Sequence, residues 1–144
     1  MFNRVILIGK IGRPPALSLS ERGQKGVEFF LGTRLFWKDK FGEGQSETDW
    51  HRISVFRKST IGWVKNTLKR GDTVYVEGRL IYEKWADKHT QVRLIPHIVI
   101  SGPEGQIKLL ESGAHEQNFS FKNSEPYGQH QRNLQPINVR RKSC

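Results

Sequence analysis

The segment DWHRISVFRK, residues 49–58, constrains the fold most, because its side chains form two very different series. In an extended strand, successive side chains point to opposite faces. Ile53 and Val55 would then share one face, which predicts a side buried in a core. The opposite face carries two aromatic rings and a cation, namely Trp50, Arg52 and Phe56. The segment therefore predicts a β-strand with a core on one side and a second, exposed surface on the other.

Similar β-rich segments recur along the chain, separated by turn residues. The expected strands occupy residues 5–11, 26–37, 48–56, 73–85 and 92–101, with a short closing strand at 107–110. The first strand is expected to end in a turn at Pro14 and Pro15. Residues 38–47 predict a long, basic, mobile connection between the second and third strands. Pro96 indicates an edge or a bulge in the strand that contains it.

Between residues 59 and 71 the apolar period changes to that of a short helix. Ser59 or Thr60 is expected to cap its start, and Gly71 to close its end. The face expected to meet the core is formed by Ile61, Val64 and Leu68. Five strands with one helix between the third and the fourth are the element order of an OB-fold barrel.

The domain organisation follows from this pattern. We expect an all-β, five-stranded OB-fold domain over residues 1–110. From residue 111 onward, Gln, Asn, Ser, Gly and Pro replace most apolar residues. Residues 111–144 therefore predict a flexible, polar tail without a core of its own.

The chain is strongly basic. Lys and Arg number 24 against 14 Asp and Glu, which gives a net charge of +10, of which +8 lies on residues 1–110. This excess favours a polyanionic partner, either nucleic acid or an acidic membrane surface. The longest apolar run, VILI at residues 5–8, is too short to cross a bilayer, so no membrane span is expected.

Nothing in the sequence indicates catalysis. Cys144 is the only cysteine, which leaves no intrachain disulfide or cysteine-based metal site and fits a reducing compartment. The five histidines show no metal-ligand spacing, and no glycine-rich phosphate loop joins a strand to a helix. We therefore expect no enzymatic activity, no metal and no cofactor.

Aromatic rings next to cations are typical of surfaces that bind single-stranded nucleic acid. Strand parity predicts exposure for Trp50, Phe56 and Trp85, each opposite an apolar series. Parity leaves Trp37 open between core and surface, and Trp63 in the helix is assigned to packing. The candidate phosphate contacts are Arg4, Lys38, Lys40, Arg52, Lys58, Lys84 and Lys88.

Four segments, in this order, resemble the bacterial and mitochondrial single-stranded DNA-binding proteins. They are NRVILIG (residues 3–9), DWHRISVF (49–56), LKRGDTVYVEGRL (68–80) and EKWADK (83–88). The resemblance implies an OB-fold that assembles as a homotetramer and wraps single-stranded DNA with little sequence preference. It also implies base stacking by Trp37, Trp50, Phe56 and Trp85, and a subunit-interface position for His51.

The resemblance further implies that the protein protects single strands during replication, recombination and repair. Bacterial members end in an acidic, Phe-terminated tip that recruits enzymes, whereas this chain ends VRRKSC, so recruitment through such a tip is not expected. This C-terminal sequence and the sequence WHRISVF at residues 50–56 favour a mitochondrial location, in the nucleoid or matrix, although no transit peptide is visible. The alternatives are the bacterial cytoplasm for location, and an OB-fold RNA-binding or primosome-like module for function.

Overall fold

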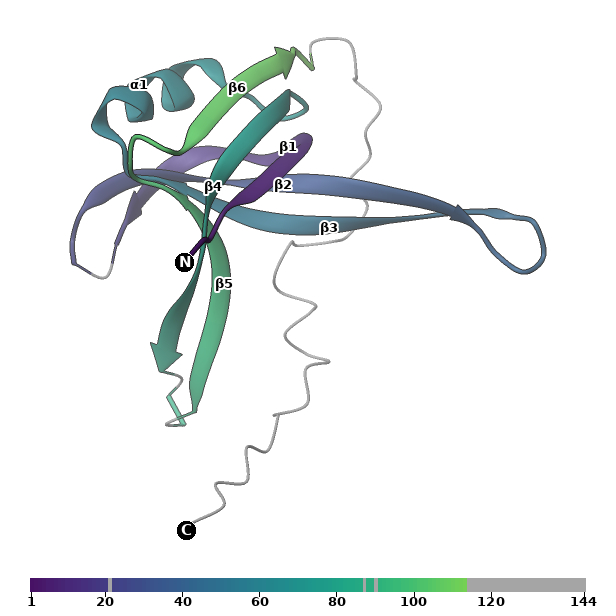
Figure 1. Cartoon of the computed structure of the whole chain (residues 1–144), viewed down its shortest axis with the longest axis horizontal. Coiled ribbons are helices and arrows are strands. Elements are labelled where there is room, and N and C mark those ends of the chain that lie inside the picture. The colour runs from purple at the N-terminus through teal and green to yellow at the C-terminus, as the bar shows by residue number, and fades with distance from the viewer. Residues whose placement is uncertain (21, 87, 90, 114–144) are drawn as a thin grey trace.

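The computed structural model describes residues 1–20, 22–86, 88–89 and 91–113 (Figure 1). Its elements in chain order are β1 (Val5–Leu19), β2 (Lys25–Lys38), β3 (Gly44–Val55), α1 (Lys58–Thr67), β4 (Thr73–Ala86), β5 (Val92–Ile100) and β6 (Gln106–Glu111). This order confirms the expected strands, the single helix between the third and fourth of them, and the short closing strand. Most of the predicted tail, residues 114–144, lies outside the described residues, so its flexibility stays a prediction.

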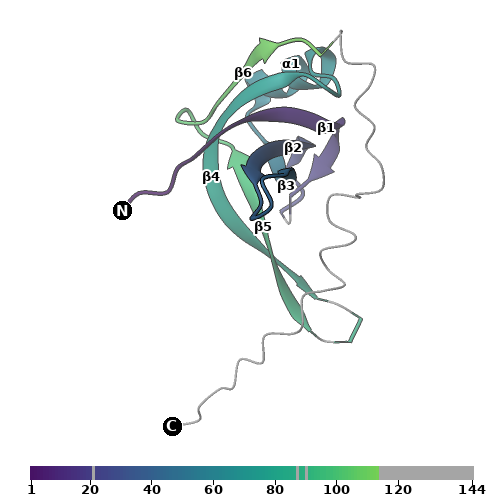
Figure 2. The same ribbon diagram turned by 90° about the vertical axis from the view of Figure 1, so that its right-hand side faces the viewer.

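The strands close into a barrel. Their order is β1-β2-β3-β5-β4-β6, and an additional antiparallel pairing joins β1 to β4. The closed ring therefore contains β1, β2, β3, β5 and β4, with β3 and β5 parallel, and β6 is added beside β4. Figure 2 shows the strong curvature of β4, which runs from beside α1 and β6 to a projecting hairpin with β5. This is the predicted OB-fold architecture.

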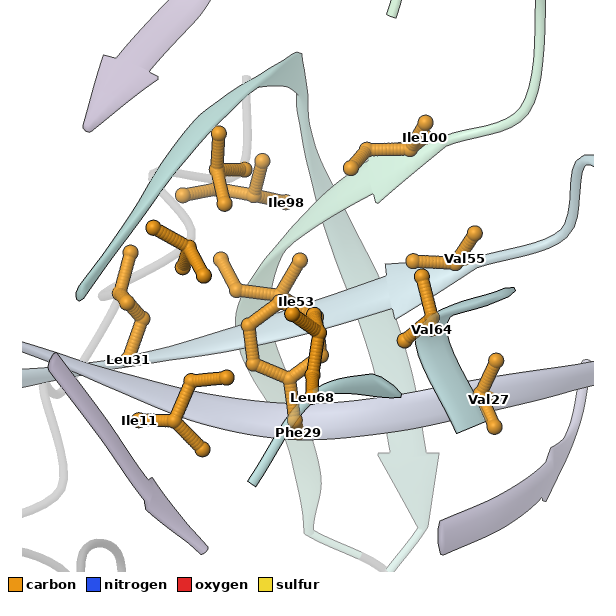
Figure 3. Close-up of a cluster of buried hydrophobic side chains, with 12 residues drawn as sticks. Ile11, Val27, Phe29, Leu31, Ile53, Val55, Val64, Leu68, Ile98 and Ile100 are labelled. Carbon is orange, nitrogen blue, oxygen red and sulfur yellow. The ribbon is translucent and has the colours of Figure 1, made fainter. Parts of the chain in front are cut away.

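The core fills this barrel (Figure 3). The buried cluster consists of Ile11, Val27, Phe29, Leu31, Ile53, Val55, Val64, Leu68, Val74, Val76, Ile98 and Ile100. Each fully buried aliphatic or phenyl side chain contributes about 1.5–3 kcal/mol to folding. The predicted core face of β3 is confirmed, because Ile53 and Val55 have no exposed surface. The helix places Val64 in the same cluster, with Leu68 just beyond its last residue, and Ile61 packs against it.

The first strand is longer than predicted. Instead of ending at Pro14 and Pro15, β1 continues to Leu19 and pairs with β2 on both sides of the proline pair. The register shifts between Ile11 and Arg13 and again between Arg13 and Ala16. Such irregularities tolerate proline, because residues at a bulge do not all donate to the ladder. The prediction of a turn at this point was therefore wrong.

The helix is shorter than predicted and begins differently. Its N-cap is Arg57, with no side-chain capping bond, so neither Ser59 nor Thr60 caps it. It ends at Thr67, and Gly71, with φ +90°, lies in the following turn, where its N–H donates to the Ile11 carbonyl at 2.8 Å. No helix in the described part of the chain is long and apolar enough to cross a membrane.

The connection between β2 and β3 also differs from the prediction. The antiparallel ladder runs without a register shift out to Lys38 opposite Gly44, which leaves only residues 39–43 as a turn. The Asp39 carboxylate accepts hydrogen bonds from the N–H groups of Glu43 and Phe41, both at 2.9 Å. These hydrogen bonds stabilise the charged carboxylate and so lower the pKa of Asp39, and the one from the Glu43 N–H has the largest effect. A hairpin with a short turn therefore replaces the expected long loop, and we call residues 34–48 the β2–β3 arm.

The prediction of an edge at Pro96 is confirmed. The ladder between β3 and β5 covers only Ile98 to Ile100 of β5. Pro96 lies before that ladder and pairs with Tyr82 of β4 on the other side. The hairpin of β4 and β5 consequently leaves the barrel as a second arm, which points down in Figure 1, whereas the β2–β3 arm points to the right.

Candidate nucleic-acid interface

The Trp50 ring packs directly on the backbone of two glycines, Gly12 and Gly32, and we call such a glycine surface the seat of the ring. In the ladder between β2 and β3 it stands opposite Gly32, and Gly12 of β1 lies next to the same ring. A methyl group at Gly12 would collide with the six-membered ring of the indole, and one at Gly32 would lie 2.9 Å from its Cζ3 atom. The absence of side chains at both positions lets the half-buried indole lie against the outer wall of the barrel. The ring therefore packs on backbone rather than on neighbouring side chains at these two positions.

Phe56 has a similar seat at the other end of the strand. A Cβ at Gly26 would lie 2.6 Å from its Cδ1 atom, so the half-buried phenyl ring packs over the β2 backbone. The backbone N–H of Phe56 donates to the Ile100 carbonyl at 2.9 Å, which fixes the chain as it leaves β3. Trp50 and Phe56 thus lie outside the core, as strand parity predicts.

The β2–β3 arm carries Trp37. Within the barrel, its face of β2 holds the core residues Phe29 and Leu31, but at Trp37 the strand has left the barrel. The indole is 43 % exposed and stands opposite Gln45. The structure thereby places outside the core a residue whose position strand parity left open.

The β2–β3 arm carries two further exposed rings that the sequence pattern did not predict as contacts. Phe36 is 69 % exposed and Phe41 is 79 % exposed, and each has a cation beside it. The Arg34 guanidinium lies 5.2 Å from the Phe36 ring centre, and the Lys40 ammonium lies 5.1 Å from that of Phe41. The signal in the sequence was the mixture of rings and cations over residues 34–41.

Two of the predicted phosphate contacts already have acidic partners. Arg52 donates from Nε to Glu28 at 2.7 Å and from Nη1 to Glu83 at 3.2 Å, and its side chain is 22 % exposed. Arg4 pairs through Nε with Glu77 at 2.9 Å. The Arg52 ion pairs connect β3 to the adjacent β2 and to β4, which is not its neighbour in the sheet. Either arginine would have to exchange a carboxylate for a phosphate in order to contact a strand.

The other predicted cations are solvent-exposed. They are Lys38 and Lys40 on the β2–β3 arm, Lys58 at the start of α1, Lys84 on β4 and Lys88 after it. Trp85 lies on β4 opposite Arg93 of β5. The side chain of Trp85 lies outside the described part of the structure, so its predicted exposure stays a prediction.

His51 lies on the core-facing side of β3, where its Nε2 atom is 2.8 Å from the Thr33 hydroxyl. Burial of the imidazole lowers the pKa of His51, while the charge of Asp49 opposes this shift. Its neutral form is therefore favoured. The contact agrees with a hydrogen-bonded structural histidine and is compatible with a position near a subunit interface.

One assignment from the sequence was wrong. Trp63 was assigned to packing, but it is 39 % exposed and takes no part in the buried cluster, because its neighbour Val64 occupies the inward face of α1. Among the described residues, no group of His, Cys, Asp and Glu is arranged to hold a metal ion. The described residues therefore include two rings packed on glycine, Trp50 and Phe56, and several exposed rings on the β2–β3 arm. Exposed lysines surround both groups.

Comparison with known proteins identifies similar chains. The model of the single-strand binding protein family matches residues 2–110. The single-stranded DNA-binding protein of Rickettsia felis is 33 % identical over 111 residues, which cover 76 % of this chain and 73 % of that protein. The protein of the same name from Rickettsia prowazekii is 32 % identical over 117 residues, which cover 81 % of this chain and 77 % of that protein.

A solved structure, a Plasmodium falciparum SSB complex with ssDNA, is also similar. Its TM-score is 0.67 and its sequence identity 34 %, and the match covers 77 % of this chain and 96 % of that one. The likeness therefore extends over nearly the whole of the solved chain.

Proposed function

The chain belongs to the single-strand binding protein family, and from this premise we propose that it binds single-stranded DNA with little sequence preference and catalyses no reaction. The observation that carries the proposal is the seating of Trp50 on Gly12 and Gly32, which presents a fixed indole on the outside of a basic barrel. A ring held in this way loses little conformational freedom when a base stacks on it.

The mechanism combines stacking with charge. Each base stacked on an aromatic ring contributes about 1–3 kcal/mol whatever its identity, because every base has a flat π-face. The residues proposed to stack are Trp37, Trp50, Phe56 and Trp85. Those proposed to contact phosphates are Arg4, Lys38, Lys40, Arg52, Lys58, Lys84 and Lys88. Neutralised phosphates release counterions, so binding weakens as salt is raised.

We assign binding to the domain of residues 1–110, which the family model matches from residue 2. The two arms widen this domain beyond its barrel, and each carries or adjoins proposed contacts. The strand β6 ends at Glu111, and the residues after it, up to residue 144, are proposed to be a flexible tail that takes no part in base stacking.

A homotetramer is the proposed assembly. On β1, Val5 and Leu7 pack against the core, whereas Ile6 and Ile8 on the other face are more than half exposed. Such a face on a barrel wall supports association with a second copy, because burial of apolar area favours assembly. His51 is proposed to lie near such an interface.

Light scattering on the wild type and on Ile8→Asp tests the proposed tetramer. A wild-type monomer would contradict it.

In the cell, the protein would coat single strands that replication, recombination and repair expose. We propose a location in the mitochondrial nucleoid or matrix, because the sequence WHRISVF at residues 50–56 resembles the mitochondrial members of the family. The Rickettsia relatives are bacterial and fit the alternative, a bacterial cytoplasm. Fractionation of the source cells, with the protein followed by antibody, would decide between the two.

The test of the binding proposal is a competition measured by fluorescence anisotropy. Labelled oligo-dT is bound to the full chain and displaced by unlabelled oligo-dT, by an RNA strand of equal length, or by a duplex. We expect the single DNA strand to compete far better than the duplex. Equal competition by the duplex would contradict stacking, and stronger competition by RNA would favour the RNA-binding alternative.

A further inference from the structure

The β2–β3 ladder keeps one register over its whole length, and this fixes which side chains share a face. From Val27 opposite Val55 to Lys38 opposite Gly44, no shift interrupts the pairing. Side chains two residues apart therefore lie on the same side of the arm. The face that carries Trp50 opposite Gly32 accordingly continues to Phe36, which stands opposite Ser46.

The distance along this face suits a nucleic-acid strand. Phe36 and Gly32 are separated by four residues, which places the two ladder positions about 14 Å apart. The positions between them on the same face hold Arg34 and Thr48. A strand that leaves Trp50 therefore meets a cation and then a second ring as it follows the arm outward.

Phe36 has the exposure that stacking requires. Phe36 is 69 % exposed. Its neighbours Leu35 and Trp37 are also exposed, but they lie on the opposite face of the ladder. Phe36 is thus an exposed ring on the face that it shares with Arg34.

The cation beside the ring indicates the kind of partner. The Arg34 guanidinium lies 5.2 Å from the centre of the Phe36 ring. A guanidinium in this position both polarises the ring and offers a positive charge to a nearby phosphate. A nucleic-acid strand with flat bases and anionic links would use both groups.

We propose that Phe36 is a further base-stacking residue, that Arg34 beside it contacts a phosphate, and that bound single-stranded DNA runs from Trp50 outward along this face of the arm. This inference rests on the proposed function but goes beyond it. Trp37 points to the opposite face of the ladder. Contacts on both faces imply that the strand crosses the arm rather than following only one side of it.

The test compares Phe36→Ala with Leu35→Ala in the full chain. Leu35 is the adjacent residue, is 62 % exposed and lies on the opposite face, so it controls for the loss of an exposed apolar side chain. With oligo-dT as the probe, we expect Phe36→Ala to weaken binding about fivefold to a hundredfold. Leu35→Ala should bind within about twofold of the wild type, and Phe36→Trp should restore affinity.

Two further measurements separate the outcomes. Arg34→Gln should lower the slope of log K against log salt concentration by about 0.7 for each phosphate that the variant no longer neutralises. Light scattering on each variant reports assembly. The proposal is overturned if Phe36→Ala binds like the wild type, or if it loses affinity only together with its oligomeric state, since Phe36 would then serve an interface between copies. If the wild type itself does not bind oligo-dT, the proposed function fails instead.

Discussion

At the scale of single residues, the interface depends on what is missing beside the rings as much as on the rings themselves. Trp50 and Phe56 lie on the outer wall because Gly12, Gly32 and Gly26 offer no side chain to displace them. The strand pattern around residue 50 predicted the outward face of Trp50. It could not predict the seat, because Gly12 and Gly32 come from other strands and meet the ring only after the barrel closes.

Substitution of Gly12 tests the seat. The nearest atoms to a Cβ at this position all belong to the Trp50 indole, so Gly12→Ala must push the ring outward. We expect weaker oligo-dT binding in a fluorescence titration. The loss of binding free energy should not exceed the contribution of one stacked base, about 1–3 kcal/mol. Gly62→Ala is the control, because a Cβ there meets no atom within 4 Å. Equal affinities for both variants would contradict the role of the seat.

His51 gives the protein a specific pH dependence. Because burial lowers its folded-state pKa below the ordinary value of 6.5, protonation is less favourable in the folded than in the unfolded chain. Its contribution to stability is therefore complete above about pH 6.5 and decreases as the pH falls below that value. Urea unfolding at about pH 7.5 and pH 5.5 should show a larger loss for the wild type than for His51→Gln. Parallel losses in the two proteins would refute this assignment.

At the scale of elements, the sequence predicted the faces that are buried in the core. It did not predict how far the strands extend beyond the core, because that depends on pairing with a neighbouring strand. The core faces of β3 and α1 follow from the spacing of Ile53, Val55 and Val64, which are fully buried. The arm beyond the barrel has little core to bury, so alternation carries no signal there. Likewise, Pro14 and Pro15 lie within β1 because bulges absorb them, and local sequence cannot show whether a neighbouring strand provides that freedom.

The ion pairs of Arg52 connect elements. Its guanidinium joins Glu28 of β2 and Glu83 of β4, so Arg52→Ala would leave two largely buried carboxylates without their cation. We expect a loss of about 1–3 kcal/mol in the free energy of unfolding, measured by chemical denaturation. Arg52→Lys should recover only part of this, since a lysine cannot present the two-pronged geometry of a guanidinium. Unchanged stability in the alanine variant would show that the pairs are worth little.

At the scale of the whole molecule, a small closed barrel provides rigidity and two arms provide reach. The barrel positions Trp50 and Phe56 on its wall, and the β2–β3 arm carries Trp37 away from it (Figure 1). The net charge of +10 attracts the phosphates of any nucleic acid, so charge alone does not distinguish a single strand from a duplex. On the proposed mechanism, discrimination comes from rings that only unpaired bases can cover.

The measurement that tests this most directly is the tryptophan fluorescence of the full chain during titration with oligo-dT, at low and at high salt, and against a duplex of equal length. We predict strong quenching by the single strand that persists in part at high salt, and a weak response to the duplex. In Trp50→Phe, the quenching by the single strand should decrease. Equal quenching by both DNAs that vanishes with salt would contradict stacking and leave only the attraction of a basic surface.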